Sequence, residues 1–349
     1  MAEFCGDKKS SYRQDQAIFA TNFRKKLLIA FLIFLIVFPL LGFGYVTYLG
    51  IMIGITIIAA HGMNILTGFT GLISLGHAAF IGVGAYSSAL LVAKLGVPFL
   101  LALPAAGAIT SIVGMLFGLP SLRIKGLYLA MATLAAQVVL HFLMVNWERL
   151  TGGVYGFVVQ TANIGPFVVD TDVKYYYLVV TIATIATLST KQLFRTKNGR
   201  AYVAIRDRDI AAEVIGVSLF KYKLQSFGIS SFYAGVAGSL LAHYLSVITP
   251  EHFPLSLSIE YLAIIIVGGL GSVLGSILGA FFIILLPEFL NEVVSSLGGL
   301  FPNAAAYLPY VKMITFGFII VAFIIFEPKG LAEIYERVKK YFKLWPYAY

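Results

Sequence analysis

Cysteine and charge are both scarce in this chain of 349 residues. The single cysteine, Cys5, excludes an intrachain disulfide and a cysteine metal site. Charged residues make up only 12% of the sequence, whereas about 25% is usual for soluble proteins, so an ordinary soluble domain is excluded. No pair of histidines has metal-ligand spacing with a carboxylate, and we therefore predict no metal site.

Motifs for nucleotide and hydrolytic chemistry are also absent. The sequence contains no G-x-x-x-x-G-K-[ST] phosphate loop, so any ATP that drives this protein must be hydrolysed by another chain. It has no G-x-S-x-G nucleophile elbow and no paired carboxylate site. We predict that the chain is not an enzyme, has no catalytic residues and binds no cofactor of its own.

Apolar residues fill the chain instead, at 59% of the sequence with a mean hydropathy of +0.90. Runs of about 20 apolar residues recur from Leu27 onward, which predicts an all-α, polytopic membrane bundle in the lipid bilayer. The ten predicted spans lie near 27–45, 50–66, 76–94, 99–119, 126–146, 175–190, 224–245, 257–270, 272–287 and 307–326. The two spans around Gly271 are short, and they form either full crossings or a re-entrant, broken pair.

The basic residues predict how the bundle is oriented. With the N-terminus inside, 21 of the 25 Lys and Arg residues fall on the cytoplasmic side, which places both termini there. The net charge of +9 therefore reflects membrane orientation, and we predict no nucleic-acid partner. The predicted parts are a tail over 1–26, a membrane domain over 27–326 with a cytoplasmic loop at 191–223 and an outer loop at 147–174, and a second tail over 327–349.

Glycines cluster twice within the apolar spans. The first cluster lies in the segment 64–86, and the second is GGLGSVLGSILGA at 268–280. Small residues four apart mark close helix packing in lipid, whereas broken helices at membrane depth can line a path for a substrate. Both alternatives stay open for the candidate residues Asn64, Thr67, Ser74, His77, Gly268, Gly269, Gly271 and Ser272. For His77, a bond that bridges two helices is favoured over a proton relay.

A charged segment from Lys191 to Lys223 interrupts the apolar pattern and holds eight basic residues. Within it, Ile210, Val214 and Val217 recur at helical spacing, which predicts a short amphipathic helix. Its apolar face needs cover, either from the membrane domain or from another protein. A plain solvated loop is the alternative.

Five motifs together resemble the LivM-type permeases of branched-chain amino acid ABC importers. They are SLGHAAF (74–80), the TGG at 151–153, GRAYVAIRDRDIAAEVIGV (199–217), GGLGS (268–272) and FEPKGL (326–331), in that order. The resemblance runs from about Tyr48 to Leu331. Urea and sugar permeases belong to the same wider group.

The resemblance implies a set of partners in a bacterial or archaeal inner membrane. These are a second, LivH-like permease, two cytoplasmic LivG/LivF-like ATPases that hold ATP and Mg, and an extracytoplasmic substrate-binding protein. It also implies that a coupling helix contacts the ATPase through Arg206, Asp207, Arg208, Asp209, Ile210, Ala212, Glu213, Val214 and Gly216. The implied substrates are branched-chain or other hydrophobic amino acids. A permease for urea or another small solute, and a self-sufficient secondary transporter, are the alternatives.

Overall fold

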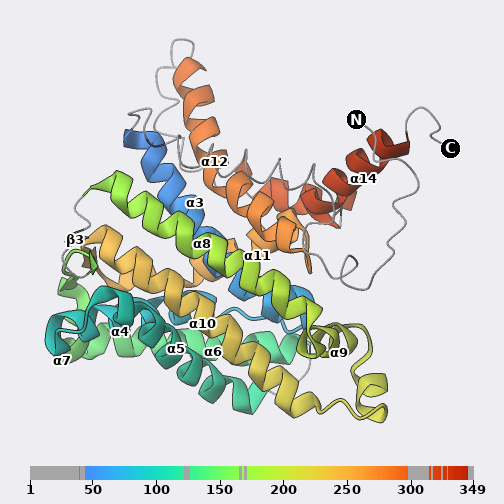
Figure 1. Cartoon of the computed structure of the whole chain (residues 1–349), viewed down its shortest axis with the longest axis horizontal. Helices are drawn as coiled ribbons and strands as arrows, with labels where there is room; N and C mark the ends of the chain where they lie inside the picture. Colours follow the sequence, from blue (N-terminus) through green and yellow to red (C-terminus); the bar gives the residue numbers. More distant parts are fainter. Residues whose placement is uncertain are drawn as a thin grey trace.

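A computed structural model of the chain describes residues 39, 44–121, 126–164, 167–168, 171–297, 314–315, 317–323, 325–327 and 329–344. This part is almost entirely helical, and its long helices lie side by side in a bundle (Figure 1). These helices are α3 (Gly44–Met63), α4 (His77–Leu95), α5 (Phe99–Ser121), α6 (Leu127–Asn146), α8 (Asp172–Arg195), α10 (Leu219–Leu245), α11 (Leu255–Gly268) and α12 (Val273–Leu297). The predicted all-helical membrane bundle is confirmed.

Within the described residues, 7 helical stretches are long and apolar enough to cross a membrane. They correspond to the predicted spans from 50–66 to 272–287, except for the one at 224–245. The predicted span 27–45 falls almost entirely outside the described residues, as does the tail 1–26, and 307–326 is described only in part. The total of ten spans and the side on which each terminus lies therefore stay predictions.

The predicted span 224–245 corresponds to α10, which lies in the core of the bundle. It packs against α5, α4 and α3, so protein surrounds it more than lipid does. Two of its serines are bonded inside the protein, since Ser239 Oγ donates to Ser88 Oγ of α4 and Ser226 Oγ donates to the carbonyl of Lys223, both over 2.7 Å. Glycines bring the backbones together, because a Cβ added at Gly84 would lie 2.7 Å from the carbonyl carbon of Gly235. A helix that is surrounded by protein can be less apolar than a helix that faces lipid.

Two breaks in the helices face each other near one end of the bundle. After α3, the chain continues as the π-helix η2 (Asn64–Phe69) and then turns at Gly71, where φ is +76°. Between α11 and α12, it turns at Gly269 and Gly271, with φ of +123° and +74°. These positive φ values explain why glycine occupies these three positions.

The prediction of two short spans around Gly271 is wrong for the second. α12 has 25 residues and continues past Pro287, at which the predicted span ended. A proline ends most helices in water, but helices within a membrane tolerate one when neighbouring groups satisfy the freed carbonyl. α11 itself is short, at 14 residues, and the 3-10 helix η4 (Pro250–His252) precedes it.

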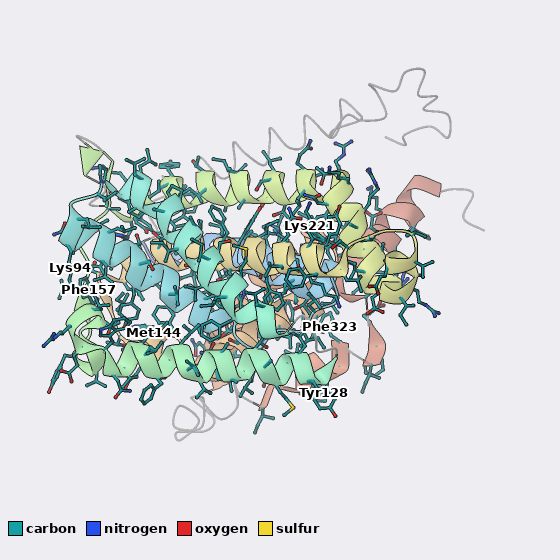
Figure 2. The ribbon with its side chains drawn as sticks, turned by 90° about the horizontal axis from the view of Figure 1, so that it is seen from below. Lys94, Tyr128, Met144, Phe157, Lys221 and Phe323 are labelled. Atoms are coloured by element: carbon teal, nitrogen blue, oxygen red, sulfur yellow. The ribbon has the colours of Figure 1, made fainter. Side chains whose placement is uncertain are left out.

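Short elements mark one end of the bundle, which we call the strand end. They are α7 (Glu148–Thr151), η3 (Gly153–Tyr155), β1 (Phe157–Val158), β2 (Asn163–Ile164), β3 (Phe167–Val168) and β4 (Val247–Ile248). β1 pairs with β4, and β2 with β3, both antiparallel. Figure 2 places Lys94 and Phe157 at this end, and Tyr128 and Lys221 at the other.

The opposite end, which we call the α9 end, carries α9 (Lys197–Val214) and α14 (Gly330–Leu344) (Figure 1). α8 runs on to Arg195 and α10 begins at Leu219, so both membrane helices extend into the predicted loop 191–223. The predicted outer loop 147–174 begins with the short elements of the strand end. The charged segment and that loop therefore lie at opposite ends of the molecule.

Candidate functional site

The amide of Asn64 joins the two helix breaks. It lies in η2 and is buried. Its Nδ2 donates to the carbonyl of Ser272 and to Ser276 Oγ, both over 2.8 Å, while its Oδ1 accepts from the backbone N–H of Gly271 over 2.9 Å. An amide offers two donors and an acceptor in one plane, and all of them are used here. Asn64 therefore fixes the turn between α11 and α12 against the end of α3.

The turn that Asn64 holds is packed backbone to backbone. A Cβ added at Gly275 would lie 2.6 Å from the carbonyl oxygen of Gly269, and one added at Gly268 would overlap the carbonyl oxygen of Gly275. Gly279 meets the carbonyl oxygen of Ile264 in the same way. The second glycine cluster is thus a closely packed helix pair, with no room for a solute between α11 and α12 at these residues.

Arg206 brings α9 to the same place. Its Nη1 donates to the carbonyl oxygen of Gly68 over 3.0 Å, and its Nε to Asp207 Oδ1 over 3.0 Å. A Cβ added at Gly271 would lie 2.7 Å from Arg206 Nη1, and one added at Gly71 would lie 3.1 Å from Arg206 Cγ. One arginine of the charged segment therefore contacts both glycine clusters, and this side of α9 rests on the bundle.

The shape of α9 differs from the short helix predicted over 206–216. The helix begins at Lys197, and Arg208 has non-helical angles, φ −156° and ψ 92°, that divide it in two. The first part is anchored by the buried side chains of Tyr202 and Ile205. The residues of the predicted apolar face, Ile210, Val214 and Val217, all follow this break, whereas Arg206 precedes it.

The second part of α9 projects from the bundle and exposes apolar side chains. The exposed fractions are 70% for Ile210, 82% for Val214 and 77% for Ile215. Ala212 is buried, Asp209 is half-buried, and the other predicted coupling residues of this part are exposed, namely Asp207, Arg208, Glu213 and Gly216.

Gly216 ends this part in a left-handed conformation, with φ +90°. The N–H of Gly216 donates to the carbonyl of Glu213, and the N–H of Val217 to that of Ala212, both over 2.9 Å. This pair of bonds is a Schellman motif, which satisfies the last carbonyls of a helix and favours glycine at that position. The exposed apolar side chains therefore sit on a short helix with a defined end.

Thr67 and Ser74 serve the turn between η2 and α4. Thr67 Oγ1 donates to the carbonyl of Leu72 over 3.1 Å. Ser74 Oγ accepts from the N–H of Gly76 over 3.3 Å. Both side chains are buried, and their bonds are local.

His77 bridges two helices. Its Nε2 lies 2.9 Å from the carbonyl oxygen of Ala59 in α3, and its ring makes an edge contact with Tyr261 of α11 at 5.4 Å between centroids. This is the bridging geometry favoured for His77 from the sequence. The ring therefore ties the start of α4 to α3 and α11.

Two polar residues that sequence reasoning missed complete the start of α4. Ser258 Oγ accepts from the N–H of Ala78 over 2.8 Å, and Gln137 Oε1 accepts from the N–H of Ala79 over 2.7 Å. Gln137 Nε2 also donates to the carbonyl of Phe253 over 3.0 Å. The first N–H groups of a helix lack partners within it, and here two other helices supply them. In the sequence, each of these two residues lies in an apolar span that holds other polar residues, so no signal distinguished it.

Among the described residues, no three side chains of His, Cys, Asp or Glu gather where they would hold a metal ion. The predicted absence of a metal and of a cofactor stays a prediction. What the geometry provides is mechanical, since one contact cluster joins α3, α9, α11 and α12.

Comparison with known proteins shows that the chain is similar to one family. A family model described as "Branched-chain amino acid transport system / permease component" matches residues 45–324. The chain is 30% identical over 342 residues to the high-affinity branched-chain amino acid transport system permease protein LivM of Escherichia coli (strain K12), covering 90% of this chain and 76% of that protein. Its identity to the LivM protein of Salmonella typhimurium is 31% over 340 residues, with the same coverage.

A more distant relative carries the name of the second permease. The probable branched-chain amino acid transport permease protein LivH of Methanocaldococcus jannaschii is 26% identical over 274 residues, which covers 74% of this chain and 82% of that protein. No solved structure matches the chain.

Proposed function

The chain belongs to the family of permease components of branched-chain amino acid transport systems, and we propose that it conducts branched-chain or other hydrophobic amino acids into the cell. It is a transport permease subunit of an ABC importer and not an enzyme. The proposed substrate rests on one observation, which is the similarity to the two LivM proteins over 90% of this chain. The multi-pass helical bundle is in keeping with a place in the inner membrane of a bacterium or archaeon.

The proposed assembly contains four further subunits. A second, LivH-like permease completes the path, two ATPases of the LivG and LivF kind hold ATP and Mg, and an extracytoplasmic binding protein delivers the amino acid. The sequence has no phosphate loop of its own, which makes separate ATPases necessary. In this assembly, the α9 end faces the cytoplasm and the strand end faces outward, as the distribution of Lys and Arg predicts.

We place the ATPase contact on the second part of α9. Ile210, Val214 and Ile215 are exposed there, and in an importer these side chains would enter an apolar groove of the ATPase. The charged side chains beside them, Asp207 and Glu213, would set the orientation of the contact. Because the first part of α9 is held by the bundle, a movement of the ATPase would be transmitted through α9 to the membrane helices.

The transmission runs through Arg206 in this account. The guanidinium joins α9 to Gly68 of η2 and lies against Gly271 of the turn between α11 and α12. A displacement of α9 would therefore move two helix breaks at once, and alternating access requires such coordinated movement of helices. Asn64, Gly268, Gly269, Gly271 and Ser272 act in this proposal as the packed joint of the bundle and not as walls of the path.

Co-purification tests the ATPase contact. The change is Val214→Asp, which places a charge in the proposed apolar contact, and the expected result is loss of the ATPase subunits from the detergent-solubilised, affinity-tagged complex. The matched control is Val158→Asp, an equally exposed valine at the strand end, which should retain them. Retention of the ATPases by both variants would refute the assigned surface. Loss by both would indicate misfolding, which the elution volume of the permease pair would reveal.

A further inference from the structure

The C-terminal helix α14 has two different sides. Spacing of three and four residues gathers its apolar residues on one side, which are Leu331, Ile334, Tyr335, Val338 and Tyr341. Charged residues occupy the remainder, namely Glu333, Glu336, Arg337 and Lys339, and the sequence adds Lys340 and Lys343. α14 follows the helical residues 325–326 after a turn, so it begins directly after the predicted span 307–326.

Among the described residues, the start of α14 packs most closely against the bundle. A Cβ added at Gly330 would lie 2.5 Å from the backbone nitrogen of Gly269, and one added at Gly269 would lie 3.1 Å from Cβ of Ala332. Further along, Arg337 donates to both carboxylate oxygens of Glu327, over 2.9 and 3.2 Å. These contacts use positions outside the apolar side.

Within the described part of the chain, Leu331 and Ile334 at the start of the apolar side are half-buried, whereas the apolar residues after them are exposed. Tyr335 is 47% exposed, Val338 49% and Tyr341 57%. Figure 1 shows α14 at the α9 end of the bundle, running across the direction of α8 and α10. α8 is long and apolar enough to cross the bilayer, so a helix that runs across the end of the bundle would lie along the membrane surface.

The charge of α14 indicates which kind of membrane surface the helix would bind. The helix has four basic residues against two acidic ones, and its three lysines belong to its C-terminal half. Lys339 Nζ lies 6.0 Å from the ring centroid of Tyr335, so its stem runs beside the apolar side. The ion pairs of Lys339 with Glu336 and of Lys329 with Glu333 are long, at 3.6 and 3.9 Å, and such exposed pairs exchange readily for other anions.

We propose that α14 lies in the headgroup layer of the membrane that the bundle crosses, with Tyr335, Val338 and Tyr341 toward the acyl chains and its lysines on anionic phospholipid headgroups. Tyrosine is enriched at this depth because its ring is apolar and its hydroxyl is wet. Lysine places its ammonium among headgroups while its stem stays in the apolar layer. Because the first turn of α14 closes over Gly269, headgroups that hold the helix also hold one side of the joint.

Spin labels at two neighbouring positions test the location. In a Cys5→Ser background, single cysteines replace Val338 on the apolar side and Glu336 on the charged side, and the full importer is reconstituted in nanodiscs that contain phosphatidylglycerol and phosphatidylethanolamine. We expect oxygen to relax the label at 338 and a water-soluble nickel chelate to relax the label at 336. Equal access of the chelate to both labels would overturn the proposal, and so would a label at 338 that neither reagent reaches, since a protein would then cover that side.

The lipid charge is tested with the same label at 338. We expect it to lie deeper in phosphatidylglycerol nanodiscs than in nanodiscs of phosphatidylcholine alone, and the double change Lys339→Gln with Lys343→Gln to abolish that difference. Lys221→Gln, an exposed lysine of α10 at the same end, is the control and should preserve it. An equal depth in both lipids for the unchanged chain would overturn the role of anionic headgroups.

Discussion

Asn64 makes three hydrogen bonds through its side chain within the joint. Its amide donates twice and accepts once, and all three partners belong to the segment Gly271–Ser276. Aspartate would lose both donors and place a charge against the carbonyl of Ser272, and an apolar residue would leave the N–H of Gly271 without its partner. A buried backbone group without a partner costs about 1–3 kcal/mol, so this position constrains the side chain strongly.

We predict that Asn64→Ala lowers the stability of the purified permease pair by about 2 kcal/mol or more, because it leaves several buried groups unpaired. The measurement is the unfolding midpoint in detergent. Asn146→Ala is the control, since Asn146 is exposed and bonds only to Phe142 within its own helix. Equal midpoints for Asn64→Ala and the unchanged chain would show that the joint contributes nothing to the fold.

We predict that Gly268→Ala sharply reduces the amount of folded protein, because its methyl group overlaps the backbone of Gly275 and α12 must move away. Overpacking of this kind costs about 1–3 kcal/mol, and more where backbone is the obstacle. Gly44→Ala is the matched control, since nothing lies within 4 Å of its added Cβ. Fluorescence-detected size exclusion of both variants gives the comparison. Indistinguishable profiles would argue against the close approach of α11 and α12.

At the scale of elements, α9, η2 and the turn between α11 and α12 meet although they are far apart in the sequence. The two glycine clusters and the charged segment could be found from spacing and composition. Their meeting could not, because the carbonyl of Gly68 is directed by a π-helical stretch that has no recognisable pattern, and Arg206 looks like any other basic loop residue. The break of α9 at Arg208 had no signal either, since neither Gly nor Pro marks it.

We predict that Arg206→Ala uncouples the two ends of the importer. ATP hydrolysis by the assembled complex should persist, while uptake per ATP falls about 10-fold or more, in the range of typical coupling free energies. Arg200→Ala is the control in the same helix, since Arg200 is exposed and its side chain bonds to the carbonyl of Arg195. Parallel assays of phosphate release and uptake in proteoliposomes decide the matter. Unchanged uptake per ATP in Arg206→Ala would exclude this route of transmission.

For the whole molecule, hydropathy located most described helices to within a few residues, because a helix that faces lipid must be apolar along its length. It erred at α12, where the general rule that a proline ends a helix has an exception. α12 continues through Pro287, at which the predicted span ended. The family resemblance rested on five short motifs, and four of them lie at the joint, on α9 or at the start of α4 or α14, where geometry restricts the side chains most.

ATP-driven uptake is the most direct test of the central claim that this chain is the passive, membrane-spanning part of an importer. Proteoliposomes would contain the chain with its second permease and both ATPases, together with the purified binding protein and radiolabelled leucine. We expect uptake that requires ATP and disappears when the ATPases are omitted. Uptake of the same size by the chain alone, whether passive or driven by an ion gradient, would contradict it.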